Sequence, residues 1–383
     1  MNILITSPHG LYEDYSFSFV HNQARAYAAL GHRVRVVLPL ALGKKNDDGK
    51  RFGKIVHTKV VDGVEICHVR HLSLGSFGAK RFNKKTAVLA FRCLMRAITA
   101  DFQPDVIHGH TLDLGSEAGT FFKKRFGCPL VVTTHGGDTF VAFDNGRQAY
   151  LRRNAQKADA VVCVSSLLRR RLEECGVSTP MPVILNGFNL SYASDNAQKD
   201  PNLVIQVGNL IPRKKTDVSI RAVAKLKERI KEIHFTSVGA GPERERMEKL
   251  CKELDVENCV SFTGQLHNQE VLQKMSEATF FVMPSVNEGF GIVYLEAMAA
   301  GCVVIGTEGE GIADLIVNGE NGFLVPADDP DAVADLIQTC AEDPQRTALI
   351  AARGKEAAQK LTWEYNARQY QTLFQNLMKG ETL

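Results

Sequence analysis

The sequence has no long hydrophobic run and no paired cysteines, and each absence excludes a class of protein. No apolar stretch among the 383 residues reaches the roughly 18 residues that a membrane-spanning helix needs. We find no secretory signal at the start, where a short apolar run ends at Pro8. The nine cysteines occur singly, with none in a C-x-x-C pair, so they indicate core residues of a reducing cytosol and not disulfides or a zinc site. These features predict a cytoplasmic protein.

The composition is that of a globular protein whose charge is unevenly distributed. Hydrophobic residues make up 44% and charged residues 23%, which excludes disorder, collagen and coiled coil. The net charge of +3 conceals two unlike halves. Residues 1–200 contain 27 lysines and arginines against 17 acidic residues, a balance of +10, whereas residues 201–383 contain 19 against 26, a balance of −7. The basic half suggests an anionic surface or ligand on that side.

Apolar, β-branched runs alternate with helical segments along most of the chain, a pattern typical of parallel sheets flanked by helices. In the first half the predicted strands are 3–5, 34–38, 64–66, 106–108, 130–133, 160–164 and 183–185. In the second half they are 203–207, 234–238, 260–262, 279–283, 303–305 and 322–325. The helices predicted in the first half are 19–30, 84–100, 114–126, 149–158 and 167–175. The fold class is therefore α/β, with two Rossmann-like, doubly wound domains.

A polar stretch over residues 191–201 has the composition of a linker. It separates a first domain of residues 1–190 from a second of residues 200–363. The tail is amphipathic, and we expect a helix over about 364–383 that packs back on the first domain. Sheets of this kind bind ligands at the carboxyl ends of their strands, so we expect the active site in a cleft between the two domains.

Residues 284–301 form the most informative segment, because a strand, a loop with two glycines and an alanine-rich helix follow one another there. The first amides of a helix have no intrahelical partners and carry the positive end of its dipole, so this loop suits an anion such as phosphate. Glu288 lies on the loop and Glu296 lies one to two turns inside the helix, where carboxylates suit the hydroxyls of a polyol. An N-terminal helix charge followed by a solvated glutamate explains the same spacing equally well.

Glu288 and Glu296, with seven residues between them, resemble the E-x7-E signature of the retaining glycosyltransferases of the large GT-B family called group 1 or family 4. Similar motifs occur in the expected order over nearly the whole chain, at residues 183–187, 238–244, 262–264 and 318–325. The resemblance implies two Rossmann-like domains that face each other across a cleft. It also implies that the first domain binds the acceptor and the second the nucleotide sugar, and that transfer retains the anomeric configuration without a metal.

The resemblance also implies roles for single residues of the second half. Glu288 would hold hydroxyls of the donor sugar near the reacting carbon, and Glu296 would hold the ribose hydroxyls of the nucleotide. The sugar and the distal phosphate would be lined by the amides of Gly289, Phe290 and Gly291. The base would contact mainly backbone groups, around Gly264, Gln265 and Leu266.

Residues 207–217 form a strand that runs into a loop with three consecutive cations. Lys214 matches the lysine that in this family neutralises the diphosphate, a leaving group that needs fixed cations when no metal is present. The family usually has arginine where Asn209 stands and glycine where Lys215 stands, so Arg213 or Lys215 would supply the missing cation. A solvated basic loop is the structural alternative.

In the first half, a predicted strand ends in His135, two glycines and Asp138. A histidine at the carboxyl end of a strand is well placed for a ligand. The segment matches the His-Gly-x-Asp of the family, which implies that His135 touches the donor sugar or the acceptor and that Asp138 supports it. Gly10 follows the first strand, where the family often has a glycine pair on the diphosphate and acceptor side, and it is the one glycine of such a pair present here.

Two sequence patterns resemble metal-binding motifs, but neither predicts a metal site. His108 and His110 are separated by one residue, so we expect them to point to opposite sides of a strand, and we see no third ligand. Residues 329–331 spell a D-x-D, which metal-dependent glycosyltransferases of another fold use, but Pro330 among acidic residues indicates a helix start. The prediction is therefore no metal and no cofactor, with a nucleotide sugar as co-substrate.

Residues 79–96 combine cations with an apolar stripe, as interfacial helices do. An ordinary helix with a basic exposed face has the same pattern, and the charge of the first half favours a membrane-borne acceptor. Nucleic acid is disfavoured, because no basic segment is interleaved with stacking aromatics.

The sequence thus predicts a metal-independent, retaining hexosyltransferase that moves a sugar from a UDP- or GDP-sugar to a hydroxyl of a glycan or lipid-linked acceptor. We expect a role in bacterial surface polysaccharide or glycolipid biosynthesis, in the cytoplasm and at the inner face of the membrane. Two alternatives stay open: an epimerase or phosphorylase on the same fold, and a non-catalytic nucleotide-sugar-binding subunit. The altered position Asn209 is compatible with the second.

Overall fold

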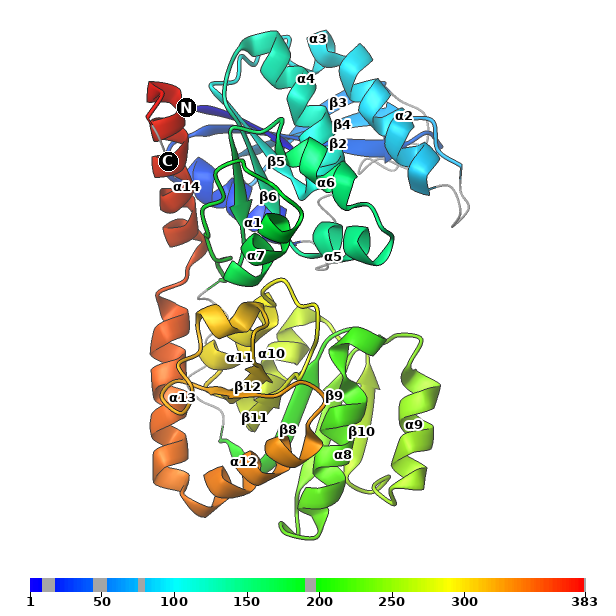
Figure 1. Cartoon of the computed structure of the whole chain (residues 1–383), viewed down its shortest axis with the longest axis vertical. Coiled ribbons are helices and arrows are strands. Elements are labelled where there is room, and N and C mark those ends of the chain that lie inside the picture. The colour runs from blue at the N-terminus through cyan, green and yellow to red at the C-terminus, as the bar shows by residue number, and fades with distance from the viewer. Residues whose placement is uncertain (9–17, 44–53, 75–79, 190–197, 382–383) are drawn as a thin grey trace. The chain divides into compact units, whose positions relative to one another are not determined.

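The computed structural model describes residues 1–8, 18–43, 54–74, 80–189 and 198–381. The chain forms two compact units. The first comprises Met1–Gly187 together with Trp363–Leu383, and the second comprises Phe188–Thr362. Figure 1 shows a sheet flanked by helices in each unit, so the structure has the two Rossmann-like domains of the predicted fold class.

The first unit contains a seven-stranded sheet in the order β3-β4-β2-β1-β5-β6-β7. Its strands are β1 (Asn2–Thr6), β2 (Arg33–Ala41), β3 (Val56–Val61), β4 (Val64–His71), β5 (Val106–His110), β6 (Leu130–Thr134) and β7 (Ala160–Cys163). All neighbours are parallel except β3 and β4. The order reverses beside β1, which pairs with β2 on one side and β5 on the other, and this switch point is where ligands bind in open α/β sheets.

One predicted strand of this sheet is wrong, and one observed strand was missed. Residues 183–185 form no strand and contribute an isolated bridge between Val183 and Cys163. Strand β3 was not predicted, although Asp62 and Gly63 adopt positive φ angles of 50° and 78° between β3 and β4, as a tight hairpin requires. The residues of β3 alternate between half-buried and exposed, whereas those of the parallel strands are mostly buried. A search for apolar runs therefore misses β3.

The helices of the first unit follow the predicted spans with local differences. They are α1 (Ser18–Ala29), α2 (Lys80–Cys93), α3 (Met95–Ile98), the π-helix η2 (Thr111–Gly115), α4 (Ser116–Phe126), α5 (Gly137–Asp144), α6 (Gln148–Ala155) and α7 (Ser166–Glu174). The helix predicted over 84–100 is divided into α2 and α3, and α4 is preceded by η2. A side chain at Gly115 would meet the carbonyl oxygen of His110 at 1.9 Å, so this glycine allows η2 to fold directly against the end of β5.

The second unit contains a six-stranded parallel sheet in the order β10-β9-β8-β11-β12-β13. Its strands are β8 (Asp200–Val207), β9 (His234–Val238), β10 (Val260–Gly264), β11 (Ala278–Val282), β12 (Val303–Thr307) and β13 (Phe323–Val325). Its helices are α8 (Thr216–Lys227), α9 (Arg244–Glu253), α10 (Asn268–Glu277), α11 (Ile292–Ala299), α12 (Pro330–Glu342) and α13 (Pro344–Gln359), with short 3-10 turns η4 (Pro212–Lys214) and η5 (Gly311–Asp314). All six strands predicted for this half are confirmed. The side chain of Asp329 accepts the amide of Ala332 at 2.9 Å and caps α12, which confirms the predicted helix start.

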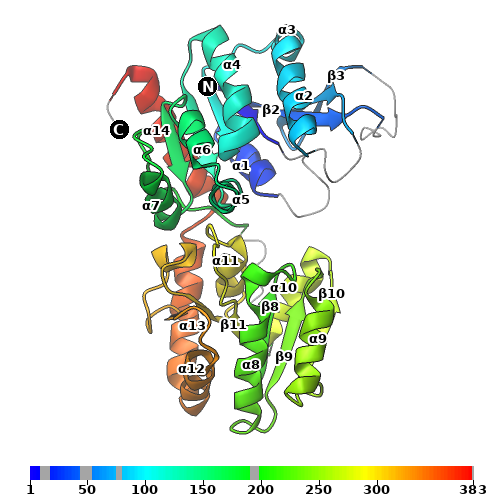
Figure 2. The same ribbon diagram turned by 45° about the vertical axis from the view of Figure 1, so that its right-hand side comes forward.

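The last helix, α14 (Trp363–Lys379), belongs to the first unit and packs on α1, as Figure 2 also shows. The side chain of Asn366 donates to the carbonyl oxygen of Leu185 at 2.7 Å and accepts from Gln23 at 2.8 Å. The hydroxyl of Tyr370 lies 2.8 Å from that of Thr133 on β6. Buried polar contacts therefore attach the end of the chain to the first sheet.

Most cysteines are buried or half-buried, as predicted, but Cys93 at the end of α2 is exposed. None of the helices in the described part of the chain combines the length and hydrophobicity needed to cross a bilayer.

Candidate functional site

The centre of the candidate site in the second unit is an ion pair between Lys214 and Glu288. The Nζ atom of Lys214 lies 2.6 Å from Oε2 of Glu288 and 3.5 Å from the sulfur of Met283. Lys214 ends η4 after β8, and Glu288 lies on the loop after β11, so two neighbouring strands present the pair at their carboxyl ends. Only 9% of Lys214 and 8% of Glu288 is exposed. Such burial of two charges is tolerable because each neutralises the other.

Arg213 is the second cation directed at this carboxylate. Its Nη1 atom lies 4.0 Å from Oε2 of Glu288 and donates to the carbonyl oxygen of Asn287 at 3.2 Å. Lys215, by contrast, pairs with Asp328 at 2.6 Å. Of the two residues considered as replacements for the missing cation, Arg213 therefore has the position to act beside Glu288.

A buried glutamine holds the backbone of Lys214. The side-chain amide of Gln206 donates to the carbonyl oxygen of Lys214 at 2.9 Å and to the hydroxyl of Thr216 at 3.2 Å, and its oxygen accepts from Ser219 at 2.8 Å. Gln206 is not among the predicted site residues. Its one sequence signal is that it is a polar residue within the apolar run 203–207 of the strand.

Glu310 holds the loop that carries Glu288, and it too was not identified. Its two carboxylate oxygens accept the backbone amides of Asn287 at 3.1 Å and Glu288 at 2.7 Å. Asn287 has a positive φ of 54°, so this turn gains from a fixed acceptor. A side chain at Gly311 would meet the carbonyl oxygen of Gly289 at 2.1 Å, which shows how closely the two loops approach. The signal in the sequence is an acidic residue between two glycines directly after a strand.

The predicted anion-binding loop leads into α11 as expected. Gly291 caps the helix with a φ of 79°, and a side chain there would meet the ring of Tyr294 at 2.8 Å. The amides of Gly289, Phe290 and Gly291 donate no hydrogen bond to any residue in the described part of the chain. These donors therefore remain able to bind an anion.

Glu296 lies within α11 and is half-buried. Desolvation raises the pKa of its carboxyl group to about 7. Within the described ranges, no residue donates a hydrogen bond to this carboxylate or forms an ion pair with it. A carboxylate that is desolvated and has no protein partner suits hydroxyl donors of a ligand.

Backbone contacts bring the other predicted donor-side residues to the same edge of the second sheet. The loops after β9 and β10 meet where the amide of Gly239 donates to the carbonyl oxygen of Gly264 at 2.9 Å, and Gly239 lies against the carbonyl of Gly208 after β8. Asn209 and Gln265 are exposed, and Leu266 is half-buried. Among the described residues, no hydrogen bond or ion pair joins the side chain of Asn209, Gln265 or Leu266 to the Lys214–Glu288 pair.

In the first unit, the side chain of His135 is held between aromatic rings. Its Nε2 atom lies 2.9 Å from Nδ1 of His110, and the two imidazoles are stacked with centroids 5.2 Å apart. The centroid of the Phe19 ring lies 4.2 Å from the centroid of the His135 ring. The expectation that His108 and His110 point to opposite sides is wrong: their ring centroids are 4.4 Å apart, because residues two positions apart on a strand share a face.

His108 and His110 have different environments on that shared face. His108 is fully buried, its Nε2 atom is 2.8 Å from the hydroxyl of Thr133, and burial lowers its pKa to about 3. It is a neutral core residue, whereas His110 contacts the candidate site residue His135.

Asp138 supports the loop that carries His135. One carboxylate oxygen accepts the amide of Leu112 at 2.7 Å, and the other accepts the hydroxyl of Thr134 at 2.9 Å and the amide of His135 at 3.3 Å. Burial raises the pKa of Asp138 above its ordinary value. Asp138 therefore holds the backbone of His135, and its part in binding an acceptor stays a prediction. Gly10, the remaining predicted acceptor-side residue, lies outside the described residues.

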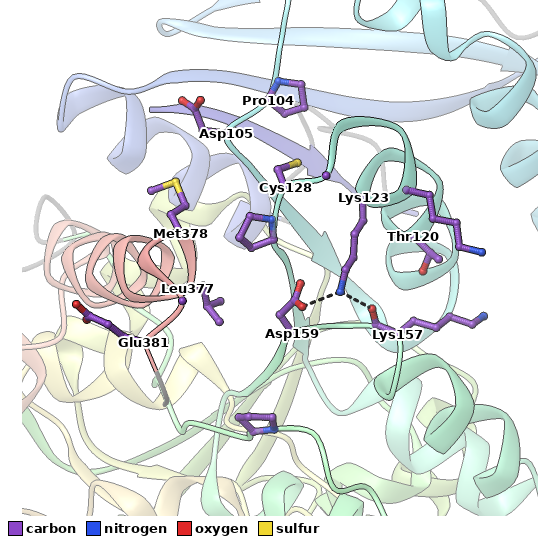
Figure 3. A pocket seen from close by; sticks show the side chains of 15 residues that line it. Pro104, Asp105, Thr120, Lys123, Cys128, Lys157, Asp159, Leu377, Met378 and Glu381 are labelled. Carbon is purple, nitrogen blue, oxygen red and sulfur yellow. Dashed lines mark hydrogen bonds and ion pairs between the residues drawn. The ribbon is translucent and has the colours of Figure 1, made fainter.

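A large cavity lies at the opposite, amino end of the strands in the first unit. It measures about 960 Å³ and is bordered by segments that precede β5, β6 and β7 and by the end of α14 (Figure 3). Figure 3 shows Lys123 pointing at Asp159, where its Nζ atom lies 2.7 Å from the carboxylate and 3.2 Å from the carbonyl oxygen of Lys157. No predicted site residue lines this cavity. In addition, no three or more histidine, cysteine, aspartate or glutamate side chains of the described residues gather so as to hold a metal ion.

Comparison with known proteins finds family models over both halves of the chain. Residues 17–192 match the model described as Glycosyltransferase Family 4, and residues 191–360 match the model described as Glycosyl transferases group 1. The chain is 28% identical to the GDP-mannose-dependent alpha-(1-6)-phosphatidylinositol monomannoside mannosyltransferase of Mycolicibacterium smegmatis, over 76% of this chain and 85% of that protein. It is 27% identical to the D-inositol 3-phosphate glycosyltransferase of a Nocardioides species, over 80% of this chain and 75% of that protein.

Among solved structures, the fold is similar to sucrose-phosphate synthase from Thermosynechococcus elongatus. The TM-score is 0.82 at 24% identity, with 99% of this chain and 100% of that chain covered. The two family models together account for residues 17–360, and the curated relatives act as glycosyltransferases by their names. The chain belongs to the group 1, family 4 glycosyltransferases and has their GT-B fold.

Proposed function

We propose that the protein is a retaining hexosyltransferase that uses a UDP- or GDP-sugar and transfers the sugar to a hydroxyl of a glycan or lipid-linked acceptor. The observation that carries this proposal is the buried Lys214–Glu288 pair beside the unbonded amides of Gly289 to Gly291. Cations, amide donors and a carboxylate converge there, and a nucleoside diphosphate sugar presents a diphosphate and sugar hydroxyls to match them. The relative that depends on GDP-mannose supports this donor class.

In this proposal the cations and backbone amides bind the diphosphate, and the carboxylates bind hydroxyl groups. An ammonium has three donors, so Lys214 can bind Glu288 and the diphosphate together. Arg213 and the amides of Gly289 to Gly291 add to the positive charge that stabilises the departing diphosphate. Glu288 accepts hydrogen bonds from the sugar, and Glu296 accepts them from the ribose. Because fixed cations of the protein supply this charge, we propose that transfer needs no metal ion and no cofactor.

His135 acts on the acceptor side of the reaction. Its contacts with His110 and Phe19 fix the imidazole, and Asp138 fixes the loop, so the ring can contact either the donor sugar or the acceptor hydroxyl. The acceptor would attack from the face that the diphosphate leaves, which preserves the anomeric configuration.

Calorimetric titration with UDP-, GDP- and ADP-sugars tests the donor, and NMR of the product anomer tests retention. We expect micromolar to millimolar binding of one UDP- or GDP-sugar, unchanged by EDTA, and a product with the anomeric configuration of the donor. Loss of affinity or activity after chelation would refute metal independence. Conversion of the donor sugar without acceptor would indicate the alternative epimerase, whereas full cellular activity of Glu288→Ala would indicate a non-catalytic subunit.

We further propose that the enzyme acts in bacterial surface polysaccharide or glycolipid assembly, in the cytoplasm at the inner face of the membrane. Helix α2 supports this location, because its exposed face carries both apolar and basic side chains. Phe82 and Leu89 are 43% and 57% exposed, and Lys85 and Arg92 on the same helix are also exposed. This combination is complementary to anionic lipid.

A further inference from the structure

The first unit contains a cavity of about 1000 Å³ at the carboxyl edge of its sheet. It is bordered by Pro8 after β1, His71 at the end of β4, and residues of α2, η2, α4, α5 and α6. The segments that follow the neighbouring strands β1 and β5 both border it, and the strand order reverses beside β1, so the cavity lies at the topological switch point of the sheet. The volume is ample for a small glycan or a sugar phosphate.

The cavity adjoins the loop of His135. Helix α5, which carries Asp138, also contributes Val141 to the cavity wall. The π-helix η2 contributes Leu114 to the wall, and its Leu112 amide is bound by Asp138. A ligand in the cavity would therefore be anchored on the same two elements that position His135.

Four cations and two carboxylates line this cavity, and both carboxylates are already engaged. Asp113 lies 3.4 Å from the Nζ atom of Lys84, and Glu117 accepts the hydroxyl of Tyr150 at 2.7 Å. Lys84 also donates to the hydroxyl oxygen of Tyr150. Burial raises the pKa of Tyr150, so its hydroxyl stays protonated and can donate to Glu117.

The other three cations, Lys85, Arg147 and Arg153, form no ion pair with any described residue. Arg147 stacks on the ring of Tyr150, with its guanidinium carbon 4.6 Å from the ring centroid. Stacking orients the guanidinium and leaves its N–H donors unused. Arg147 caps the start of α6, and Tyr150 and Arg153 follow it at intervals of three residues, so these three residues lie towards one side of the helix.

We propose that this cavity binds the acceptor through an anionic group, a phosphate ester, held by Arg147, Arg153 and Lys85. The proposal rests on the transferase function proposed above and adds the chemical class of the acceptor. Paired guanidinium groups match the oxygens of a phosphate, and Lys84, Tyr150 and Glu117 form a fixed floor beneath it. Free phosphate esters and the headgroup of a phospholipid share this chemistry.

Titration of the full-length protein with inorganic phosphate, in the presence of saturating UDP or GDP to occupy the donor site, tests the proposal. We expect the double variant Arg147→Gln/Arg153→Gln to bind phosphate about tenfold more weakly than the native protein, since two charge-assisted contacts are lost. Arg152→Gln, an exposed residue of α6 outside the cavity wall, is the matched control and should bind phosphate normally. Equal phosphate binding by the double variant and the native protein would overturn the proposal.

A second variant is expected to raise the affinity for phosphate. Misfolding would not produce such an increase. Glu117→Gln keeps an acceptor for Tyr150 but removes a negative charge, so phosphate should bind roughly threefold more tightly. Unchanged or weaker phosphate binding by a folded Glu117→Gln protein would contradict the proposal.

Two further titrations distinguish the source of the phosphate. sn-Glycerol 3-phosphate represents a free phosphate ester, and phosphatidylglycerol vesicles, compared with phosphatidylcholine vesicles, represent a lipid headgroup. Weakening of either interaction by Arg147→Gln/Arg153→Gln supports the proposal and names the source, and weakening of neither overturns it. UDP and GDP affinities are measured in parallel: a native protein that binds no nucleotide contradicts the proposed function, whereas normal nucleotide binding with phosphate affinity independent of Arg147 and Arg153 contradicts only this inference.

Discussion

Lys214 and Glu288 lie 74 positions apart in the chain and form an ion pair in which each side chain is 11% exposed. Removing one partner leaves a buried, unpaired charge, whereas removing both leaves none. We expect Lys214→Ala or Glu288→Ala alone to lower the free energy of unfolding by about 3–5 kcal/mol. The double variant should recover part of this loss in urea denaturation, while transferase activity stays absent in all three.

The neighbouring pair of Lys215 and Asp328 is the matched control. The side chain of Asp328 is 59% exposed, so the solvent screens this pair. Lys215→Ala should therefore change the free energy of unfolding by no more than about 1 kcal/mol. A double variant of Lys214 and Glu288 whose loss of stability equals the sum of the two single losses would show that the buried charges are not coupled.

The carboxyl group of Glu296 makes both stability and donor binding depend on pH. Its pKa in the folded protein is about 7, above the ordinary value of 4.5, so the folded state binds the proton more tightly than the unfolded state. The stability contributed by this group is complete below about pH 4.5 and is lost as pH rises through 7. Relative to Glu296→Gln, the native protein should lose roughly 3 kcal/mol of unfolding free energy between pH 4.5 and pH 8.

Donor affinity should change with pH in the opposite direction. In its proposed role Glu296 accepts hydrogen bonds from two hydroxyls, which both of its oxygens can do best when the group is ionised, so nucleotide affinity should rise between pH 6 and pH 8. Calorimetric titrations at both pH values with Glu296→Gln test this, because the variant should bind more weakly at pH 8 and with little pH dependence. A native protein whose donor affinity is the same at both pH values would contradict the assigned role of this carboxylate.

At the scale of elements, α14 depends on buried polar contacts as much as on apolar packing. Asn366 bridges the side chain of Gln23 on α1 and the carbonyl oxygen of Leu185. Asn366→Ala leaves both groups buried without this partner, so we expect a loss of about 1–3 kcal/mol in the free energy of unfolding. Gln375→Ala, at an exposed position of the same helix, is the control and should be nearly neutral in the same denaturation experiment.

At the scale of the whole molecule, the excess of positive charge lies in the half of the sequence that contains α2. If α2 contacts anionic lipid, Phe82→Ser/Leu89→Ser should weaken sedimentation with phosphatidylglycerol vesicles at least about tenfold, because two apolar side chains no longer enter the interface. Salt at 0.5 M should weaken binding further by screening the cations. Leu349→Ser, at an exposed position of the second unit, should have no effect, and an equal loss in this control would contradict the assignment.

The sequence by itself determined the α/β fold class and most strands of both sheets, and it predicted where along the chain the candidate donor site lies. Parallel strands buried on both faces are continuous apolar runs, so each can be located along the chain without tertiary information. Lys214, Glu288 and Glu296 follow strands and helix starts that local patterns already mark. The half-exposed strand β3 lacked such a run, although its Asp62-Gly63 turn was a usable signal.

Only the tertiary structure decided which side chains meet. No local pattern links Glu310 to the amides of Asn287 and Glu288, because the contact joins loops from two different strands. The stacking of His110 on His135 and the engagement of Glu117 by Tyr150 likewise join separate elements. Sequence periodicity reports the environment of one element at a time, whereas ion pairs, hydrogen bonds and cavities depend on distances between elements, which packing alone sets.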